Sequence, residues 1–378
     1  IPTLTKLNRS FYIDFLYRTR KETTYKQGVI LPFKNTQTLN RRRFFMKKAM
    51  LLALMLVTLL LTACGGKKTE TTEVATTEEQ ITVGFIYVGP VGDGGYSYAQ
   101  NEGRLFLEKE TGVKTLFKES VPEGPEVKEV AKNMIDQGAT VIIATSFGYM
   151  DYIEELSKEF PNVKFLHCSG YKTTENMTNY FGRIYQARYL SGLVAGLKTT
   201  SNKVGYVAAF PIPEVIRGIN AFTQGVRKAN PNATVEVVWT STWYDPAKEK
   251  DAAIALIDKG ADVIAQHQDT AGPQQAAEER GVFSIGYNTD MASVAPKANM
   301  TSAIWNWGPY FVSQIKAIKE GTWTNTPYWG PMSDNVVALA PLTANAPEGA
   351  QALVDEEKAK ILAGSWDVFY GPLKDQTG

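Results

Sequence analysis

The sequence predicts an α/β protein with two similar lobes, each a doubly wound parallel sheet flanked by helices. A repeat is the first observation: "MIDQGATVII" (Met134–Ile143) recurs 122 residues later as "LIDKGADVIA" (Leu256–Ala265). The second is that apolar, strand-like runs alternate with amphipathic helical segments around both copies, a pattern typical of parallel sheets covered by helices. A chain of 378 residues, 44% of them hydrophobic, is long enough for two such lobes.

The first half begins with the strand "TVGFIYVGP" (82–90) and a helix containing "QNEGRLFLEK" (100–109). The next helix, "PEVKEVAKNMIDQG", has apolar residues at the spacing of one helical face: Val127, Val130, Ala131, Met134 and Ile135. Gly138 suits a left-handed helix C-cap, and "ATVIIAT" after it is apolar throughout, as expected of a strand covered on both faces. "NVKFLHCS" (162–169) is the next predicted strand.

The second half follows the same order. "KVGYVAAFP" (203–211) matches residues 82–90 at an offset of 121, and "FTQGVRKANP" (222–231) occupies the place of residues 100–109. "GVFSIGYN" (281–288) corresponds to residues 162–169. Each half therefore predicts strand, helix, strand, helix, strand, helix, strand, and two copies of this order predict two lobes.

The N-terminal residues predict an export signal rather than part of a folded domain. "MKKAMLLALMLVTLLLTAC" begins with two lysines and continues into an apolar run of 14 residues, which predicts a lipoprotein signal peptide at 46–63. About 20 residues are needed to cross a bilayer, so a spanning helix is not expected. "LTAC" is similar to a bacterial lipobox, which implies cleavage before Cys64 and lipid attachment to its sulfur. An ordinary signal peptide with a chance cysteine is the alternative.

The flanking segments differ in composition from the predicted lobes. Residues 1–45 include "RRRFF", which is compatible with a nucleic-acid-binding tail, but we interpret them as a spurious upstream extension with Met46 as the initiator. Residues 64–80 comprise the lipidated cysteine and a polar Thr/Glu-rich flexible tether. Cys168 then has no partner for an internal disulfide, and we expect it to be buried.

Charge excludes one class of partner. Residues 1–63 hold 12 of the 40 Lys and Arg but 2 of the 39 Asp and Glu, so the remainder has 28 basic and 37 acidic residues and a net charge of −9. Nucleic-acid binders need clustered basic surface, so we expect no nucleic-acid partner.

Candidate ligand contacts lie just after the predicted strands, because open parallel sheets bind ligands at the carboxyl ends of their strands. Aromatic residues recur there: Tyr96, Phe147, Tyr171, Phe210, Trp243, Tyr244, Tyr287, Trp305 and Trp307. Asp93, Asp269, Asp290, His267 and Asn288 stand among them. Rings of this kind stack on flat heterocycles, and the carboxylates accept hydrogen bonds from ring N–H and amine groups. The glycine-rich stretch 92–95 would allow close backbone approach to a ligand, but no phosphate-binding loop is present in the sequence.

Five longer motifs carry a family resemblance: "VGPVGDGGYSYAQNEGR", "AAFPIPEVIRGINAFTQGVRKANP", "WYDPAKEKDAA", "GADVIAQHQD" and "TSAIWNWGPY". They resemble the basic membrane protein family, the lipid-anchored substrate-binding proteins of ABC transporters that are related to the purine nucleoside receptor A lipoproteins. The resemblance covers residues 81–378. It implies a type I periplasmic-binding-protein fold with two Rossmann-like lobes, three hinge crossovers and a purine ligand.

The resemblance also implies boundaries. We expect crossovers near Tyr185, Asn306 and Asn325, so that lobe 1 comprises 81–184 and 306–325 and lobe 2 comprises 185–305 and 326–378. Family members usually continue beyond the point where this chain stops at "YGPLKDQTG", so we expect lobe 2 to be C-terminally truncated.

Two departures from the family pattern favour a free base, adenine above all, over a nucleoside. Trp305 stands where nucleoside-binding members are expected to have a lysine that reaches the ribose, and Ser169 replaces an expected Asp. The candidate ligand-binding residues are Asp93, Tyr96, Phe147 and Ser169 from lobe 1 and Phe210, Trp243, His267, Asp269, Asp290 and Trp305 from lobe 2. Tyr96 and an opposing ring are expected to sandwich the base while the lobes close over it.

We expect a binding protein and not an enzyme, without cofactor or metal, because metal spacings such as H-E-x-x-H and the G-x-S-x-G elbow are absent from the sequence. His167 is expected in a core and His267 either in packing or at the ligand. The expected partners are a purine base or nucleoside, an ABC permease, and the cell membrane through the lipid anchor on the extracytoplasmic face, with the protein monomeric. A sugar ligand, or a surface sensor without a transport role, remains the alternative.

Overall fold

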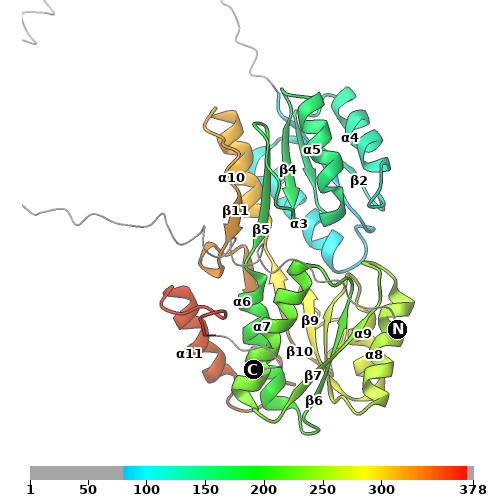
Figure 1. Cartoon of the computed structure of the whole chain (residues 1–378), viewed down its shortest axis with the longest axis vertical. Coiled ribbons are helices and arrows are strands. Elements are labelled where there is room, and N and C mark those ends of the chain that lie inside the picture. The colour runs from blue at the N-terminus through cyan, green and yellow to red at the C-terminus, as the bar shows by residue number, and fades with distance from the viewer. Residues whose placement is uncertain (1–79, 373–378) are drawn as a thin grey trace, which may run out of the picture. The chain divides into compact units, whose positions relative to one another are not determined.

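The computed structural model describes residues 80–372, and these form two lobes with one six-stranded sheet each (Figure 1). The predicted upstream extension 1–45, signal peptide 46–63 and most of the segment 64–80, including Cys64, lie outside the described residues. The fold class predicted from the sequence, two doubly wound α/β lobes, is confirmed.

The first sheet has the strand order β11-β5-β4-β3-β1-β2, and all of its neighbouring strands are parallel. Its elements are β1 (Thr82–Ile86), α3 (Tyr96–Thr111), β2 (Lys114–Lys118), α4 (Glu126–Asp136), β3 (Val141–Ala144), η1 (Phe147–Tyr149), α5 (Met150–Glu159), β4 (Lys164–Cys168), β5 (Met177–Gly182), α10 (Gly308–Lys319) and β11 (Tyr328–Gly330).

The second sheet has the order β12-β10-β9-β8-β6-β7, parallel except for the short edge strand β12, which pairs antiparallel with β10. Its elements are α6 (Ile184–Lys198), β6 (Lys203–Ala208), α7 (Pro213–Ala229), β7 (Thr234–Trp239), α8 (Pro246–Asp258), β8 (Val263–His267), α9 (Gly272–Arg280), β9 (Phe283–Asn288), β10 (Asn299–Trp305), η2 (Met332–Asp334), β12 (Val337–Leu339) and α11 (Ala350–Leu362).

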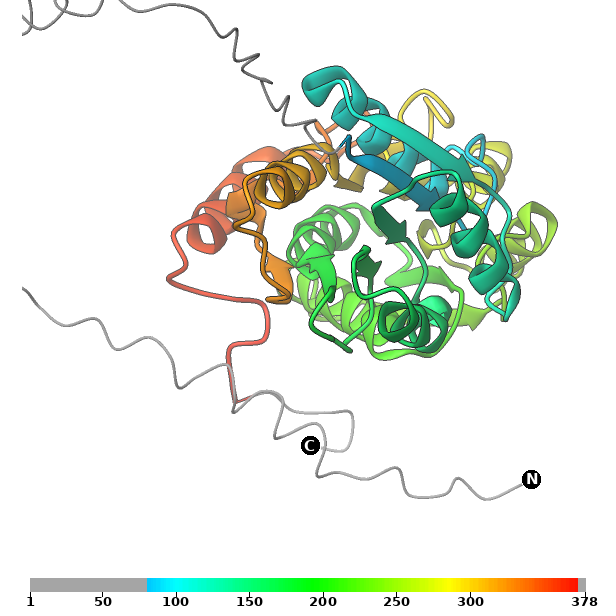
Figure 2. The same cartoon turned by 90° about the horizontal axis from the view of Figure 1, so that it is seen from above.

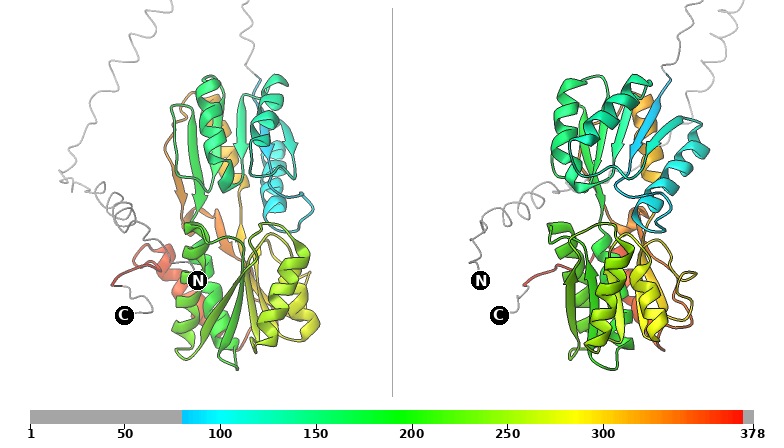
Figure 3. Two further views of the ribbon diagram at one scale, coloured as in Figure 1. Left: turned by 45° about the vertical axis from the view of Figure 1, so that its right-hand side comes forward. Right: turned by 90° about the vertical axis from the view of Figure 1, so that its right-hand side faces the viewer.

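Helices cover both faces of each sheet (Figure 2). In the first lobe, Val141 and Ile143 of β3 face α3 and α10, whereas Ile142 and Ala144 face α4 and α5. The second lobe repeats this with α6 and α7 on one face and α8 and α9 on the other (Figure 3). Strands buried on both faces must be apolar throughout, which is why the repeated segments contain few polar residues.

The sequence repeat conserves one packing device in both lobes. A Cβ atom on Gly84 in β1 would lie 2.7 Å from the sulfur of Met134, and one on Gly205 in β6 would lie 2.9 Å from Cβ of Leu256. Both distances are too short for real side chains. Glycine at these positions therefore lets the first helix after each edge strand, α4 after β2 or α8 after β7, pack directly on the strand next to that edge.

Three passages connect the lobes. The chain crosses at Arg183 between β5 and α6, at Asn306 and Trp307 between β10 and α10, and at residues 331–336 between β11 and β12. The first two adjoin the predicted points, Tyr185 and Asn306. The third follows β11, which is part of the first sheet through its pairing with β5, and so it lies after the position near Asn325 that the sequence analysis assigned.

Candidate functional site

A cavity lies where the carboxyl ends of the two sheets face each other. Its volume is about 20 Å³, which is room for about one water molecule. Ten residues line it: Val88, Tyr96, Ser146, Phe147 and Ser169 from the first lobe, and Glu214, Trp243, His267, Asp269 and Tyr287 from the second. Most lie at the carboxyl end of a strand or within three residues after it, as expected for a ligand site in open parallel sheets.

Six of the ten candidate residues named from the sequence line this cavity: Tyr96, Phe147, Ser169, Trp243, His267 and Asp269. The ring of Tyr96 faces the cavity while its hydroxyl donates to the Thr145 carbonyl inside the first lobe. Phe147 begins the short turn η1, and Trp243 lies on the loop after β7. A role of these side chains in ligand binding remains a prediction.

The carboxylates Asp93 and Asp290 are not among the lining residues. Asp93 is buried at the start of α3, where it accepts hydrogen bonds from the backbone N–H groups of Gly95 (2.8 Å), Ser97 (2.9 Å) and Tyr98 (2.9 Å). Burial raises the pKa of Asp93 to about 6 in spite of these bonds. It therefore caps the helix that carries Tyr96. Asp290 is exposed and accepts from the Ala292 N–H (3.0 Å).

The aromatic candidates Phe210 and Trp305 act as packing partners of the cavity wall. Phe210 meets the ring of Trp243 edge-on, with centroids 5.1 Å apart. Trp305 is buried, stacks on Trp307 at 4.5 Å, and donates its indole N–H to Asn288 (3.1 Å). Trp305 is not among the residues that line the cavity, and its ring also packs against Phe181 (4.8 Å between centroids) and Tyr287 (6.5 Å).

Tyr287, one of the aromatic residues noted at the strand exits, also lines the cavity, and so do Glu214, Ser146 and Val88, which were not predicted. Glu214 lies in the first turn of α7; its carboxylate accepts from the Ser169 hydroxyl and is 3.5 Å from Nε2 of His267. An acid in the first turn after a proline is the usual complement to a helix dipole. In the sequence, Glu214 therefore has the pattern of a residue that stabilises a helix N-terminus. Only its position in the segment after β6 indicated that it lies at the site.

The electrostatics of the cavity favour ligands that donate hydrogen bonds. Burial raises the pKa of Asp269 well above its ordinary value, with the charges of Asp93 and Glu249 adding to the effect, and its Oδ2 has no hydrogen-bond partner within residues 80–372. Burial lowers the pKa of His267 to about 4, so its imidazole is neutral at pH 7. No lysine or arginine is among the described residues that line the cavity. Two acids without a lining cation disfavour an anion.

The lobes touch directly around the cavity. Besides the Ser169–Glu214 hydrogen bond, Thr289 donates to the Gly94 carbonyl across the lobes (2.6 Å). A Cβ atom on Gly95 would lie 2.2 Å from the Asp269 carbonyl oxygen. Glycine at position 95 is therefore required for the two lobes to meet, so the close approach that the glycine-rich stretch allows is between the lobes.

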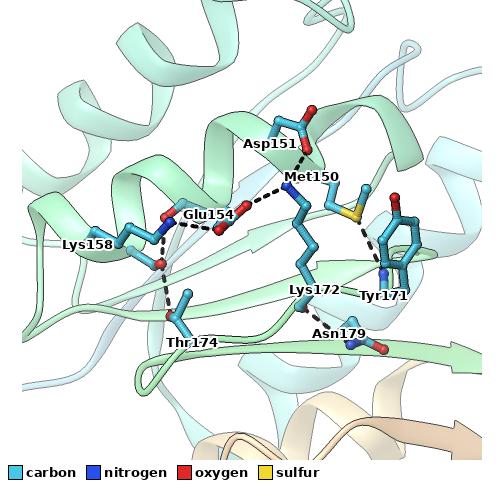
Figure 4. A network of polar contacts seen from close by, with 9 residues as sticks. Met150, Asp151, Glu154, Lys158, Tyr171, Lys172, Thr174 and Asn179 are labelled. Carbon is cyan, nitrogen blue, oxygen red and sulfur yellow. Dashed lines mark hydrogen bonds and ion pairs between the residues drawn. The ribbon is translucent and has the colours of Figure 1, made fainter.

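A polar network supports the first-lobe wall (Figure 4). Nζ of Lys172 lies 2.9 Å from Asp151 and 2.5 Å from Glu154 and so links α5 to the loop after β4. That loop begins at Ser169, and α5 directly follows the turn that carries Phe147. The lysine thus holds two cavity-lining segments together.

Comparison with known proteins identifies the fold's family. Residues 80–365 match the model of the Bmp family, described as ABC transporter substrate-binding protein PnrA-like. The chain belongs to this family. The resemblance stated from the sequence motifs is confirmed, and the protein is an ABC transporter substrate-binding protein. Its family is extracytoplasmic and is not a class of enzymes.

Two relatives of this Bmp-family protein differ in their named ligands. A purine-binding protein of Brucella abortus (strain 2308) is 41% identical over 80% of this chain and 87% of its own length. A putative ABC transporter glucose-binding protein of Haloferax volcanii is 37% identical over 80% of this chain and 79% of its own.

Solved structures support the fold. An ABC transporter solute-binding protein from Conexibacter woesei has a TM-score of 0.62 and 25% identity, covering 76% of this chain and 98% of that one. One from Aeropyrum pernix K1 has a TM-score of 0.67 and 21% identity, covering 79% and 95%. Within residues 80–372, the Bmp-family protein contains no helix that is both long and apolar enough to span a membrane.

Proposed function

We propose that this Bmp-family protein binds a purine base, adenine above all, between its lobes and delivers it to an ABC permease, while a lipid on Cys64 anchors it to the extracytoplasmic face of the membrane. One observation carries the proposal: two carboxylates, Glu214 and Asp269, stand among four aromatic rings with no cation among the described lining residues. A flat, uncharged heterocycle rich in N–H donors matches that chemistry.

The contacts divide between stacking and hydrogen bonding. Tyr96 and Phe147 present rings from the first lobe, Trp243 and Tyr287 from the second. Stacking of a base on an aromatic side chain is worth roughly 1–3 kcal/mol. An amine or ring N–H that donates to Oδ2 of Asp269 would give that buried atom its partner.

Binding requires movement, because a cavity of about 20 Å³ does not hold a purine. Ligand enters when the lobes separate, and contacts to both lobes then favour closure. The closed pair of lobes is the form that the permease is expected to recognise. A monomer suits this movement, and sedimentation of the purified protein tests that state.

The test is a titration of the purified protein with adenine, adenosine, guanosine, ribose and glucose, followed by tryptophan fluorescence and calorimetry. Saturable adenine binding, tighter than that of the nucleosides and absent for both sugars, is the expected result. A response to sugars alone would overturn the proposal. Incubation with a nucleoside is expected to release no base, and release would identify an enzyme.

A sugar is the second candidate, because the relative from Haloferax volcanii is named as a putative glucose-binding protein. Carboxylates and aromatic rings also bind pyranoses, through their hydroxyl groups and C–H faces. The purine remains preferred because the relative from Brucella abortus, named as purine-binding, is 41% identical. Neighbouring genes for a permease and an ATPase would distinguish a transport component from a surface sensor.

A further inference from the structure

We propose that Glu123, which does not line the cavity, is a positioning residue that joins the two aromatic walls of the site across the lobes and so stabilises the closed form. This inference rests on the proposed function. It assigns a role to a residue in the loop between β2 and α4 that neither motif nor family match singles out.

One carboxylate contacts both walls. Oε1 of Glu123 accepts from the Ser146 hydroxyl (2.6 Å) and from the Gly148 N–H (2.7 Å), the two residues on either side of Phe147. Oε2 accepts from the indole N–H of Trp243 in the second lobe (3.0 Å). Because Phe147 and Trp243 line the same cavity from opposite lobes, the position of this carboxylate determines how closely their segments approach.

The neighbouring residues hold Glu123 in place. The hydroxyl of Tyr149 donates to the carbonyl of Val121, two residues before Glu123 (2.5 Å). A Cβ atom on Gly148 would lie 2.5–2.8 Å from side-chain atoms of Glu123, so only glycine at 148 leaves room for the carboxylate. On the other lobe, Phe210 packs against the Trp243 ring. Both ends of the contact are thus supported independently of a ligand.

The contact joins two lobes, so it exists only when they meet. Its loss therefore destabilises the closed form and is expected to speed ligand release while leaving capture by the open form unchanged.

The experiment measures closure and release in Glu123→Ala, Trp243→Phe and the double variant. Trp243→Phe retains a ring and loses only the N–H donor with part of the indole. Donor and acceptor dyes on Asp136→Cys in α4 and Asp251→Cys in α8, both exposed positions, report closure without depending on tryptophan signals. Cys168 is fully buried and does not interfere, and Cys64 is replaced by alanine. Glu129→Ala, an exposed acid on α4, is the matched control for loss of charge.

Each single variant is expected to release adenine about fivefold faster, the effect of losing one exposed hydrogen bond to a carboxylate, with association changed by less than about twofold. The double variant should release adenine no faster than the single variant with the higher release rate.

Gly148→Ala should speed adenine release as much as Glu123→Ala does, although Glu123 is still present. Three results would overturn the assignment. They are additive effects of the two substitutions on the release rate, an association rate that falls as much as the release rate rises, and equally fast release in Glu129→Ala.

The two proposals fail separately. If the unmodified protein binds no purine, the proposed function is wrong, but the distance between the dyes without ligand still tests Glu123. Glu123→Ala should then shift the distribution toward longer distances and Glu129→Ala should not. An unchanged distribution in Glu123→Ala refutes the positioning role.

Discussion

The buried side chain of Glu249 makes the stability of the second lobe, which also carries Asp269, depend on pH. Its side chain is fully buried in α8 and accepts from the backbone N–H of Asp245 (3.0 Å) and from the N–H and hydroxyl of Thr270 (3.1 and 2.5 Å). Burial raises the pKa of Glu249 from its ordinary 4.5 to about 7. The folded state therefore holds a proton that the unfolded state releases, so this contribution to stability is full below pH 4.5 and is lost as the pH rises through about 7.

The magnitude follows from the shift. At about 1.4 kcal/mol per pKa unit, moving from pH 4.5 to 7 removes about 3 kcal/mol of stability contributed by this group. That corresponds to roughly 6 °C in Tm at about 2 °C per kcal/mol for a protein of this size. Glu249→Gln carries no titrating group, so its Tm relative to the unmodified protein should rise by about this amount across the same pH range.

The difference between variant and unmodified protein is the quantity to measure, by scanning calorimetry between pH 4.5 and 8. Burial lowers the pKa of His167 and of His267 to about 4, so both contribute stability above their ordinary 6.5 that is lost as the pH falls through 4. Their slope is opposite in sign to that of Glu249, and it cancels in the difference. Glu348→Gln, at an exposed acid, is the control and should follow the unmodified curve. A difference that does not change with pH would refute the assignment of the titration to Glu249.

Three further predictions concern the site. Asp269→Asn replaces one carboxyl oxygen with an amide N–H donor and should weaken adenine binding by at least about tenfold in calorimetry, about 1.5–3 kcal/mol, without loss of fold; unchanged affinity would contradict the role of Asp269. Gly95→Ala places a methyl group against the Asp269 carbonyl, so small-angle scattering with ligand should show the lobes held apart; a closed profile would contradict this. Lys172→Met removes the link between α5 and the loop after β4, so amide hydrogen exchange of residues 169–174 should become faster. The control is Lys158→Met, because Lys158 pairs with the same Glu154, and it should leave the exchange rate of these residues almost unchanged.

The fold could be predicted because the two halves of the chain share the same local sequence patterns. The apolar strand and the glycine before it recur in both copies, and packing of α4 on Gly84 and of α8 on Gly205 imposes the same requirement twice. The location of the cavity followed from the topology, since strand ends in a doubly wound sheet converge at one edge. Those two inferences needed no side-chain detail.

The direction in which individual side chains point was less predictable. Asp93 and Trp305 occupy strand-exit segments, but the first caps α3 and the second is packed between other rings. Nothing in the local sequence separates an acid that caps a helix from one that faces a ligand, as Glu214 also illustrates. Glu123 was missed because its contacts depend on where the second lobe lies, which no periodicity in the sequence reports.

The order of the chain has a consequence for its synthesis. Helix α10 and strand β11 complete the first lobe, with Phe311 against Phe85 (5.4 Å) and β11 along the edge of β5, yet both come after most of the second lobe in the sequence. A polypeptide that emerges amino end first therefore exposes the unfinished apolar face of β1 and the bare edge of β5 until residue 330 has appeared. Until then, these two surfaces are open to contacts with other unfinished chains, the usual route to aggregation.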